Sequence, residues 1–516
     1  MKAKFSLFLF LISFFVFAQV EEKKLDELIQ NTLKTFDVPG ISVGVVKDGK
    51  VIYSKGFGVR SLTSKQKMTD ETLVGIASNS KGFTATALAL LADEGKLNFD
   101  DKVTKYIPEF QMYDPYVTQN VTIKDLITHR AGLGLGQGDL MFFPEGGNLS
   151  VNDIIHNVRY LKPENPFRTT LDYNNIMFIV AGEVIHRVSG LSWAEFIEQR
   201  ILKPVGMTSS FGSYNRAKAA NVSNIIEAHA PVDGKAVAVP HDWNETANAA
   251  GGIISNVKDM TTWAEFLMNG FTTKDGKKLV SDKQIQQLWN LQISTPVALK
   301  NPYDSNFGGY GLGWFLTDVK GHKQVYHTGG LIGTVTQFTL IPDMKLGIVV
   351  LTNQQSGAAF STITNTIKDS YLGMPEKDWL KTYGDRMAKV NADYAKDKKE
   401  IFAKSESFKR DKNCQIKNNQ ITGTYNDLWF GDVTISQYGK NLRFASKNSP
   451  RLKGELLPYS PNVMIVKWDD RSYDADAFVN FDLDENGKAT GMKLKPISDV
   501  TDFSFDFEDL DLVKKN

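Results

Sequence analysis

The sequence contains very little cysteine, because Cys414 is the one cysteine in a chain of 516 residues. A chain with a single cysteine forms no internal disulfide, so its stability depends on the packing of hydrophobic cores. We interpret the thiol as an ordinary residue without a functional role. The length is too great for one core and predicts two or three domains.

The sequence also has no excess of charge of either sign. It contains 60 lysine and arginine residues against 59 acidic residues, which gives a net charge of +1. Because nucleic-acid-binding proteins carry a basic excess, the composition predicts no nucleic-acid partner. The seven histidines show no close paired spacing, and no phosphate-binding glycine loop occurs. We therefore expect no metal site of the zinc or iron type.

Long hydrophobic runs are rare, and the one that occurs lies at the N-terminus, in "MKAKFSLFLFLISFFVFAQ". Two lysines, an apolar run and then Ala18 are typical of a secretory signal peptide cleaved near that alanine. The alternative is an uncleaved anchor helix, but the run is shorter than the roughly 20 apolar residues that a bilayer span needs. We expect residues 1–18 to be a signal peptide. The mature protein would then be periplasmic or secreted, with no stable membrane span.

Strands are predicted near both ends of the first domain, and helices between them. "ISVGVVKDGKVIYSKGFG" is typical of a hairpin that turns at Asp48-Gly49, and "TVTQFTLIPDMKLGIVVLTN" of two strands joined at Pro342-Asp343. Residues 120–270 have mostly helical spacing. The pattern predicts an α+β domain over residues 19–373, with one antiparallel sheet assembled from its two ends.

The remaining sequence changes character twice. Residues 374–412 are dense in charge and predict a solvated helical linker. Residues 413–516 contain short β-like runs with hairpin turns at 438–440 and 485–487, which predicts a small antiparallel β-barrel or sandwich. In residues 503–507 phenylalanines alternate with polar residues, and this period predicts a half-buried strand.

The stretch "IASNSKGFTATALALLADEGKL" places Ser78 and Lys81 one turn apart at the start of an apolar helix. Burial lowers the pKa of a lysine, and a neutral amine can accept the proton of a serine hydroxyl. Free N–H groups in the first turn favour negative charge on the serine oxygen. The pair thus predicts a nucleophile with its base. The alternative is a helix capped by Ser78 or Ser80, with Lys81 reaching to water.

Similar patterns occur elsewhere in the chain. Ser-x-x-Lys recurs at Ser64, in a polar loop, and at Ser255, which we expect to cap a surface helix. Residues 40–44 fit the G-x-S-x-G pattern of a nucleophile elbow, but that elbow needs a turn where this sequence predicts a continuing strand. We therefore expect Ser42 to be a sheet residue.

Two later segments carry further candidates. In "LDYNN", a tyrosine near a cationic lysine can have a lowered pKa and pass a proton to a leaving group, so Tyr173 is one candidate. The amide of Asn175 can orient the lysine and donate to a substrate carbonyl. In "HTGGLIGTVTQF", glycines allow close approach, and the N–H of Gly330 could pair with that of Ser78 to stabilise an oxyanion. Taken singly, these segments also fit a helix start and a glycine turn.

Taken in order, the three segments resemble the Ser-x-x-Lys, Tyr-x-Asn and Lys/His-Thr-Gly motifs of the penicillin-recognising serine hydrolases. The nearest group is that of class C β-lactamases, DD-peptidases and esterases. Connecting segments such as "VTIKDLITHRAGL", "AAGGIISNVKDM" and "GYGLGW" are similar too, so the resemblance covers roughly residues 24–372. It implies a helical subdomain packed on an α+β sheet domain, with the active site between them.

The resemblance implies a role for each residue. Ser78 would be acylated, Lys81 and Tyr173 would transfer protons, and the N–H groups of Ser78 and Gly330 would form the oxyanion hole. Four residues would bind substrate: Asn175, His327, Thr328 and Gly329. The reaction would be acyl transfer followed by hydrolysis, without metal or cofactor.

One departure from the β-lactamase pattern bears on the substrate. Many β-lactamases carry a lysine where this chain has His327, which is mostly neutral at pH 7. We therefore expect a peptide substrate, including peptides with D-residues, or an ester. The alternatives are a β-lactamase and a penicillin-binding sensor that is acylated without turnover. The oligomeric state stays open.

The tail resembles the lipocalin-like domain that follows some of these hydrolases, mainly in "ITGTYND". Such a domain could shape the active-site cleft, drive oligomerisation, bind an apolar ligand or serve as a structural appendage.

Overall fold

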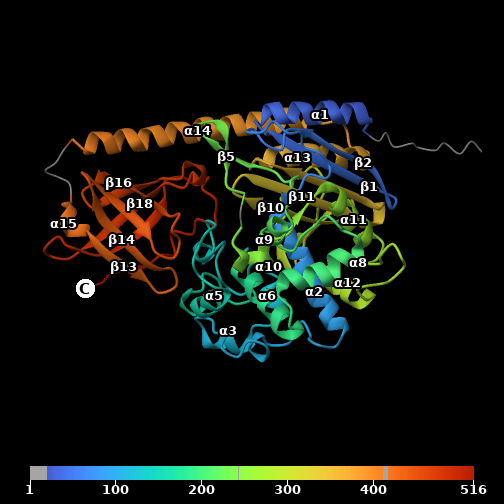
Figure 1. Ribbon diagram of the computed structural model, residues 1–516, viewed down its shortest axis with the longest axis horizontal. Coiled ribbons are helices and arrows are strands. Elements are labelled where there is room, and N and C mark those ends of the chain that lie inside the picture. The colour runs from blue at the N-terminus through green and yellow to red at the C-terminus, as the bar shows by residue number, and fades with distance from the viewer. Residues whose placement is uncertain (1–19, 242, 411–415, 516) are drawn as a thin grey trace, which may run out of the picture.

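The computed structural model describes residues 20–241, 243–410 and 416–515. The predicted signal peptide and Cys414 lie outside the described residues. Figure 1 shows a larger body of sheet and helices and a smaller β-barrel, with the long helix α14 (Trp379–Phe408) running along one side of both. This helix occupies most of the segment predicted as a charged linker.

An antiparallel sheet of eight strands forms the centre of the larger body, in the order β2-β1-β12-β11-β10-β9-β8-β7. The strands are β1 (Gly40–Lys47), β2 (Lys50–Gly58), β7 (Ile293–Thr295), β8 (Gly308–Tyr310), β9 (Phe315–Val319), β10 (His322–Leu331), β11 (Thr334–Ile341) and β12 (Leu346–Thr352). Because β1 pairs with β12, strands from the two ends of the domain lie side by side, as predicted. Both predicted hairpins are confirmed.

Helices cover both faces of this sheet. Helices α1 (Glu22–Thr35) and α13 (Gly357–Tyr371) pack on one face, and α11 (Val257–Met268) packs on the other. A Cβ atom at Gly44 of β1 would lie 2.5 Å from the Thr261 side chain of α11, so the glycine allows the helix to pack closely. Coverage of both faces explains why β12 is apolar throughout rather than alternating.

A helical subdomain follows β2 in the chain. Its longer helices are α2 (Ser80–Asp93) and α6 (Ile176–Ser189), and its shorter ones include α4 (Ile123–Leu126), α5 (Val151–Asn157), α7 (Trp193–Ile197) and α10 (Asn248–Gly251). Residues 80–91 of α2 are all buried, as expected for a helix that is apolar on every side. No single helix of the described residues has the length and apolar content to cross a membrane. Two consecutive helical segments, Ile176–Ser189 and Trp193–Val205, meet that criterion only if they are counted as one, and the chain bends by 72° between them.

The smaller body is a closed antiparallel barrel of eight strands, β13 to β20. They span Gly423–Asp427, Gly431–Tyr438, Asn441–Ser446, Lys453–Ser460, Val463–Trp468, Ala477–Leu483, Ala489–Pro496 and Leu512–Lys514. The predicted turns at 438–440 and 485–487 are confirmed as hairpins. Large side chains such as Tyr425, Phe481 and Trp468 are buried in this body.

The strand predicted at residues 503–507 is wrong. These residues belong to a loop, the 497–511 loop, that joins β19 to β20. Its backbone makes local turns, with the Phe505 N–H donating to the Asp502 carbonyl at 2.9 Å, rather than a sheet ladder. The three alternating phenylalanines do not share one environment either: Phe505 and Phe507 are buried, whereas Phe503 remains 42% exposed.

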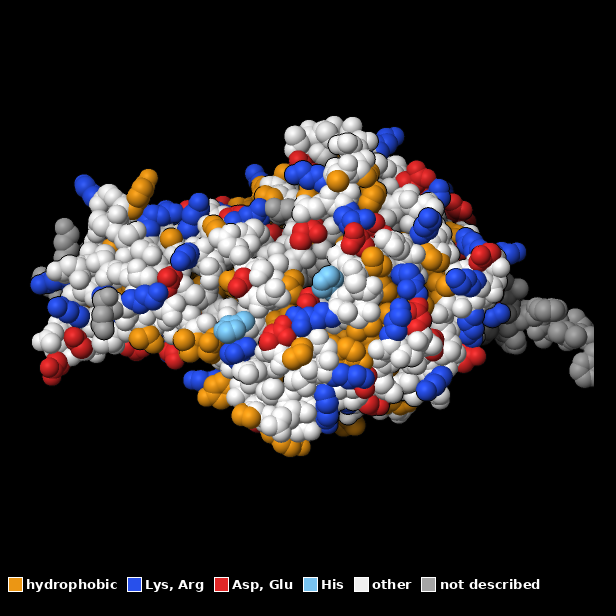
Figure 2. All heavy atoms as spheres, turned by 60° about the horizontal axis from the view of Figure 1, so that its bottom comes forward, with side chains coloured by type: hydrophobic (Ala, Val, Ile, Leu, Met, Phe, Trp, Pro, Cys, Tyr) orange, Lys and Arg blue, Asp and Glu red, His pale blue; other side chains and the backbone are white. Residues whose placement is uncertain are grey.

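The 497–511 loop docks on the helical subdomain, so the two bodies touch directly as well as through α14. The Gly138 N–H donates to the Asp506 carboxylate at 2.5 Å, and the Phe143 and Phe505 rings meet at 5.0 Å between centroids. Figure 2 shows acidic and basic side chains intermixed over one face of the molecule, in keeping with the balanced composition.

Candidate active site

Ser78 lies in a single 3-10 turn, η1 (Ala77–Asn79), directly before α2. Ala77 has a φ of +50°, a left-handed conformation that is uncommon outside glycine. The Thr336 hydroxyl of β11 donates to the Ile76 carbonyl at 2.9 Å and accepts a bond from the Asn79 side chain. The turn that presents Ser78 is therefore fixed to the sheet on both sides.

Lys81 is completely buried in the first turn of α2. Its Nζ contacts the Ser78 Oγ at 2.9 Å, the Asn175 Oδ1 at 2.7 Å and the Ala250 carbonyl oxygen at 2.9 Å. Burial lowers the pKa of Lys81 from its ordinary value to about 7, against the opposing effect of the Asp139 carboxylate. The expected drop in its pKa is confirmed, and the alternative in which Lys81 reaches to water is excluded.

The three partners of Lys81 are not equivalent. The Asn175 Oδ1 and the Ala250 carbonyl oxygen can only accept hydrogen bonds, so they take both N–H groups of a neutral amine. The nitrogen lone pair is then left for the Ser78 hydroxyl, which can donate. In its neutral form the amine is thus placed to accept the proton of Ser78.

Asn175 connects Lys81 to a buried carboxyl group. Its Nδ2 donates to the Asp139 Oδ2 at 2.7 Å while its Oδ1 accepts from Lys81. Burial raises the pKa of Asp139 to about 7, although the hydrogen bonds from Asn175 and Ser504 lower it. Sequence reasoning missed Asp139; an acidic residue in the otherwise apolar "GDLMFF" was the available indication.

Tyr173 lies just before α6, as expected, and its ring lies 4.8 Å from the Lys81 Nζ. Its pKa is not lowered as expected: burial raises it, and a hydrogen bond with the Ser78 side chain only partly opposes that rise. The Tyr173 hydroxyl therefore keeps its proton at neutral pH. Asn174, rather than Asn175, caps α6 by accepting the Met177 N–H at 3.2 Å.

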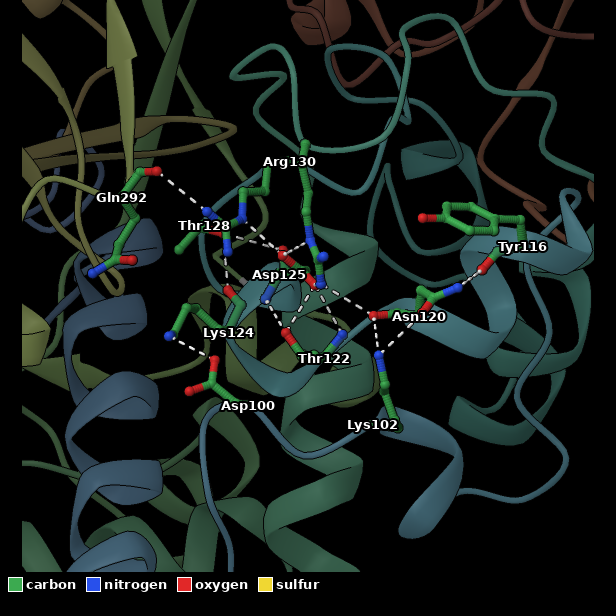
Figure 3. A network of polar contacts seen from close by, with 11 residues as sticks. Asp100, Lys102, Tyr116, Asn120, Thr122, Lys124, Asp125, Thr128, Arg130 and Gln292 are labelled. Atoms are coloured by element: carbon green, nitrogen blue, oxygen red, sulfur yellow. Dashed lines mark hydrogen bonds and ion pairs between the residues drawn. The ribbon is translucent and has the colours of Figure 1, made fainter.

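Figure 3 shows a network of polar contacts around Asp125. Through Arg168 this network holds the loop before α6, which carries Tyr173. The buried Asp125 carboxylate pairs with Arg130 at 2.7 Å and with Arg168 at 2.6 Å. Burial would raise the pKa of Asp125, but the hydrogen bonds from Arg168 and Thr122 hold it below its ordinary value. Two contacts to His129, from the N–H groups of residues 172 and 174, attach the same loop.

Strand β10 forms the opposite wall of the site. Its pairing with β9 runs only from His322 to Tyr326. Beyond that point, the edge of β10 that faces β9 has no β9 partner at residues 327–331. A Cβ atom at Gly329 would lie 2.4 Å from the Ile76 carbonyl oxygen, which shows how closely β10 approaches η1. The exposed Gly330 has open space around it. The segment is a strand rather than a glycine turn.

His327 is buried and neutral. Its Nδ1 lies 2.6 Å from the Thr328 carbonyl oxygen, and its Nε2 lies 2.9 Å from the Tyr310 hydroxyl, which donates to it. Burial, together with the nearby Lys81, lowers the pKa of His327 to about 3. The expectation of a neutral imidazole is confirmed, and the ring is held by Tyr310.

A cavity of about 280 Å³ lies in front of Ser78. Its apolar walls come from both bodies: Leu135, Phe142, Phe143, Trp243, Phe315, Leu331 and Phe503. Its polar lining consists of Ser78, Tyr173, Asn175, His327, Thr328, Asp502 and Ser504. Among the described residues that line it there is no lysine or arginine, and the one carboxylate is that of Asp502.

The remaining serine patterns lie in other places. Ser64 is in a loop, and Ser42 is buried in β1, as expected. The prediction for Ser255 is wrong: it is buried and contacts the Ser210 hydroxyl at 2.8 Å, while Asn256 caps α11.

Comparison with known proteins gives two matching family models. The Beta-lactamase model matches residues 25–371, and a domain of unknown function, DUF3471, matches residues 419–514. The chain is 29% identical over 377 residues to "Unguisins hydrolase ungD'" of Aspergillus campestris, covering 70% of this chain and 67% of that protein. It is 28% identical over 343 residues to "Protein flp" of Staphylococcus aureus, covering 65% of this chain and 64% of that protein.

Solved structures share the fold. An octameric penicillin-binding protein homologue from Pyrococcus abyssi matches 96% of this chain and 100% of its own, with 22% identity and a TM-score of 0.61. A class C β-lactamase from Rhodobacter sphaeroides matches 68% of this chain and 100% of its own, with 20% identity and a TM-score of 0.54. The Beta-lactamase family model spans most of the chain, and the arrangement of Ser78 and Lys81 fits it. This protein therefore belongs to the beta-lactamase family.

Proposed function

We propose that the protein is a serine hydrolase that forms an acyl-enzyme on Ser78. The observation that supports this most is the buried Lys81 amine, whose other two partners can only accept hydrogen bonds, so that its lone pair faces the Ser78 hydroxyl. Membership of the beta-lactamase family and the similarity to a named hydrolase support the same class of reaction.

In the proposed reaction the Ser78 Oγ attacks the substrate carbonyl carbon as its proton passes to the neutral Lys81 amine. The N–H groups of Ser78 and Gly330 stabilise the oxyanion. When the tetrahedral intermediate collapses, the bond between the carbonyl carbon and the leaving group breaks. The leaving group takes up the proton held by Lys81 by way of the Tyr173 hydroxyl. Water then attacks the acyl carbon and gives a proton to the neutral Lys81 amine. That proton passes to the Ser78 Oγ as the bond between this oxygen and the acyl carbon breaks, which releases the acid.

The lining of the cavity favours a neutral, apolar acyl group. No cation among the described lining residues could pair with a free substrate carboxylate, and the neutral His327 does not supply one. The free edge of β10 supports binding of an extended peptide as an added strand. We therefore propose a peptide, including peptides with D-residues, or an ester as the substrate, and weak activity on β-lactams.

The N-terminal sequence pattern supports an exported enzyme, in the periplasm or outside the cell. The balanced charge supports a small-molecule or peptide substrate rather than a nucleic acid. The role that remains to be tested first is that of Ser78.

A serine-directed fluorophosphonate probe, read out by intact mass, tests the proposal. We expect one adduct on the wild-type protein, located at Ser78 by peptide mapping, and none on Ser78→Ala. Ser255→Ala, in a buried Ser-x-x-Lys sequence away from the cavity, is the matched control and should label normally. Absence of an adduct at Ser78 would contradict the proposed function.

Turnover distinguishes the enzyme from a protein that is only acylated. We expect product release from p-nitrophenyl esters or D-amino-acid p-nitroanilides, and slower release from nitrocefin. A persistent adduct without product would instead support a penicillin-binding sensor, and fast nitrocefin hydrolysis would support a β-lactamase.

A further inference from the structure

The 497–511 loop brings a hydroxyl group from the barrel into the polar core of the first domain. The Ser504 side chain is buried, and its Oγ donates to the Asp139 Oδ2 at 2.8 Å. The two residues are 365 positions apart in the sequence. Neither was a candidate from the sequence, and neither has a role in the proposed reaction.

We propose that Ser504 is a positioning residue of the active site, which acts on Lys81 through Asp139 and Asn175. The inference rests on the proposed function, because it assumes that Lys81 is the base for Ser78. It assigns to the barrel a direct part in tuning catalysis.

The contacts form one continuous path. Ser504 and Asn175 both donate to the Asp139 Oδ2, at 2.8 Å and 2.7 Å. Asn175 then accepts from the Lys81 Nζ at 2.7 Å, and Lys81 contacts the nucleophile. Since an amide that donates at one end accepts at the other, Asp139 fixes which way Asn175 is turned. The orientation of the Lys81 amine thus depends on the Asp139 carboxylate.

Ser504 matters because Asp139 has few donors. Its Oδ1 is buried and has no hydrogen-bond partner among the described residues, so its ionised form relies on Asn175 and Ser504. A buried carboxylate that loses one of two donors is more readily protonated. A protonated Asp139 no longer favours the ammonium form of Lys81 by Coulombic attraction.

Other titratable groups surround this path. From the helical subdomain and β10, His129 and His327 have lowered pKa values and Tyr173 has a raised pKa, all by burial, so all three stay neutral. From the 497–511 loop, burial raises the pKa of Asp502 and Asp506. Of the three buried carboxyl groups, that of Asp139 is the one that accepts a hydrogen bond from Asn175.

The test is the pH profile of the rate at which the fluorophosphonate probe phosphonylates Ser78 with loss of fluoride. In Ser504→Ala we expect the acidic limb of the profile to move to lower pH by about half a unit, because Lys81 loses a stabilising anion. The plateau rate should fall by about three- to tenfold, because Asn175 is held less firmly. Ser504→Cys, with a similar shape and a weaker donor, should lie between Ser504→Ala and the wild type.

Asp139→Asn tests the path itself. If Ser504 acts through Asp139, then adding Ser504→Ala to Asp139→Asn changes the profile no further. The matched control is Ser498→Ala in the same loop, whose hydroxyl accepts the N–H of the exposed Val500. Its profile should coincide with that of the wild type.

The outcomes separate the two proposals. A wild-type protein that is not labelled at Ser78 overturns the proposed function. A wild type that is labelled, with a Ser504→Ala profile that coincides with it, overturns only the role of Ser504. A full Ser504→Ala effect in the Asp139→Asn background also overturns it, because the effect would then bypass Asp139. Near-ultraviolet circular dichroism establishes that each variant compared is folded.

Discussion

At the scale of single residues, Lys81 explains an unfavourable feature of the sequence. A cation in the first turn faces the positive end of the helix dipole, and here it is also fully buried. Both effects favour the neutral amine, which is the form that a base requires. The features that weaken the helix are therefore those that suit the proposed chemistry.

The first prediction concerns the pH dependence of kcat/KM for an ester substrate. Because burial lowers the pKa of Lys81 to about 7, the amine is protonated below that pH and neutral above it. We expect kcat/KM to rise with pH through about 7 and then level off. A steady-state pH series with wild-type protein measures this, and a flat profile between pH 5.5 and 8.5 would contradict it.

The second prediction compares two lysines. Lys81→Arg should abolish acylation at every accessible pH, because a guanidinium stays protonated. Lys258→Arg is the matched control: this lysine also follows a serine by three positions, but it pairs with Glu71 at the surface. It should acylate like the wild type, and equal loss in both variants would show that Lys81 has no special role.

At the scale of elements, the site depends on how closely β10 approaches η1. A methyl group at Gly329 would meet the Ile76 carbonyl oxygen of the main chain at 2.4 Å and the Ala77 Cβ at 2.9 Å. At Gly330 the nearest atom would be 3.9 Å away. Gly329 is therefore needed for the close packing of β10 on η1, whereas a side chain at Gly330 would meet no close contact.

The third prediction follows from this difference. Gly329→Ala should destabilise the protein by about 1–3 kcal/mol, because the backbone must shift to relieve the contact. Gly330→Ala should leave the free energy of unfolding within about 0.5 kcal/mol of the wild type. Urea unfolding of both variants measures the difference, and equal stabilities would contradict the close approach.

The fourth prediction concerns the network in Figure 3. Asp125→Asn leaves Arg130 and Arg168 without their buried partner and should cost about 3 kcal/mol. Asp100→Asn, which breaks an exposed pair with Lys124, should cost less than about 1 kcal/mol. Because the pKa of Asp125 is lowered, its contribution is present above the unfolded pKa and is lost as the pH falls through the folded value.

The elements that the sequence predicted well are those defined locally. Hairpin turns and the apolar strands depend on residues within a few positions of each other. Residues 503–507 were predicted as a strand because alternation alone does not distinguish a sheet face from a loop packed between two bodies. Asp139 was missed because its partners Asn175 and Ser504 are distant in sequence.

At the scale of the whole molecule, two bodies enclose one cavity. Phe503 and Ser504 of the barrel line the same space as Ser78, and Phe505 contacts Phe143 of the helical subdomain. Of the roles considered for the tail, shaping the active-site cleft is the one that these contacts support.

The fifth prediction tests that contact. Phe505→Ala removes a buried ring from between the bodies and should destabilise their docking by about 3 kcal/mol. We expect faster amide hydrogen exchange in residues 139–143 and lower esterase activity, although Ser78 and Lys81 are unchanged. Val513→Ala, at an exposed position of β20, is the control and should alter neither.

The placement of Ser504 and Phe503 has a consequence for how the protein matures. Ser504 follows Asp139 by 365 positions, and domains generally fold as units, so the first domain can fold before the residues that close its cavity are in place. Full hydrolytic activity would then be reached only when the second body docks. The appearance of enzyme activity during refolding could accordingly serve as a clock for domain assembly, separate from the recovery of helical structure.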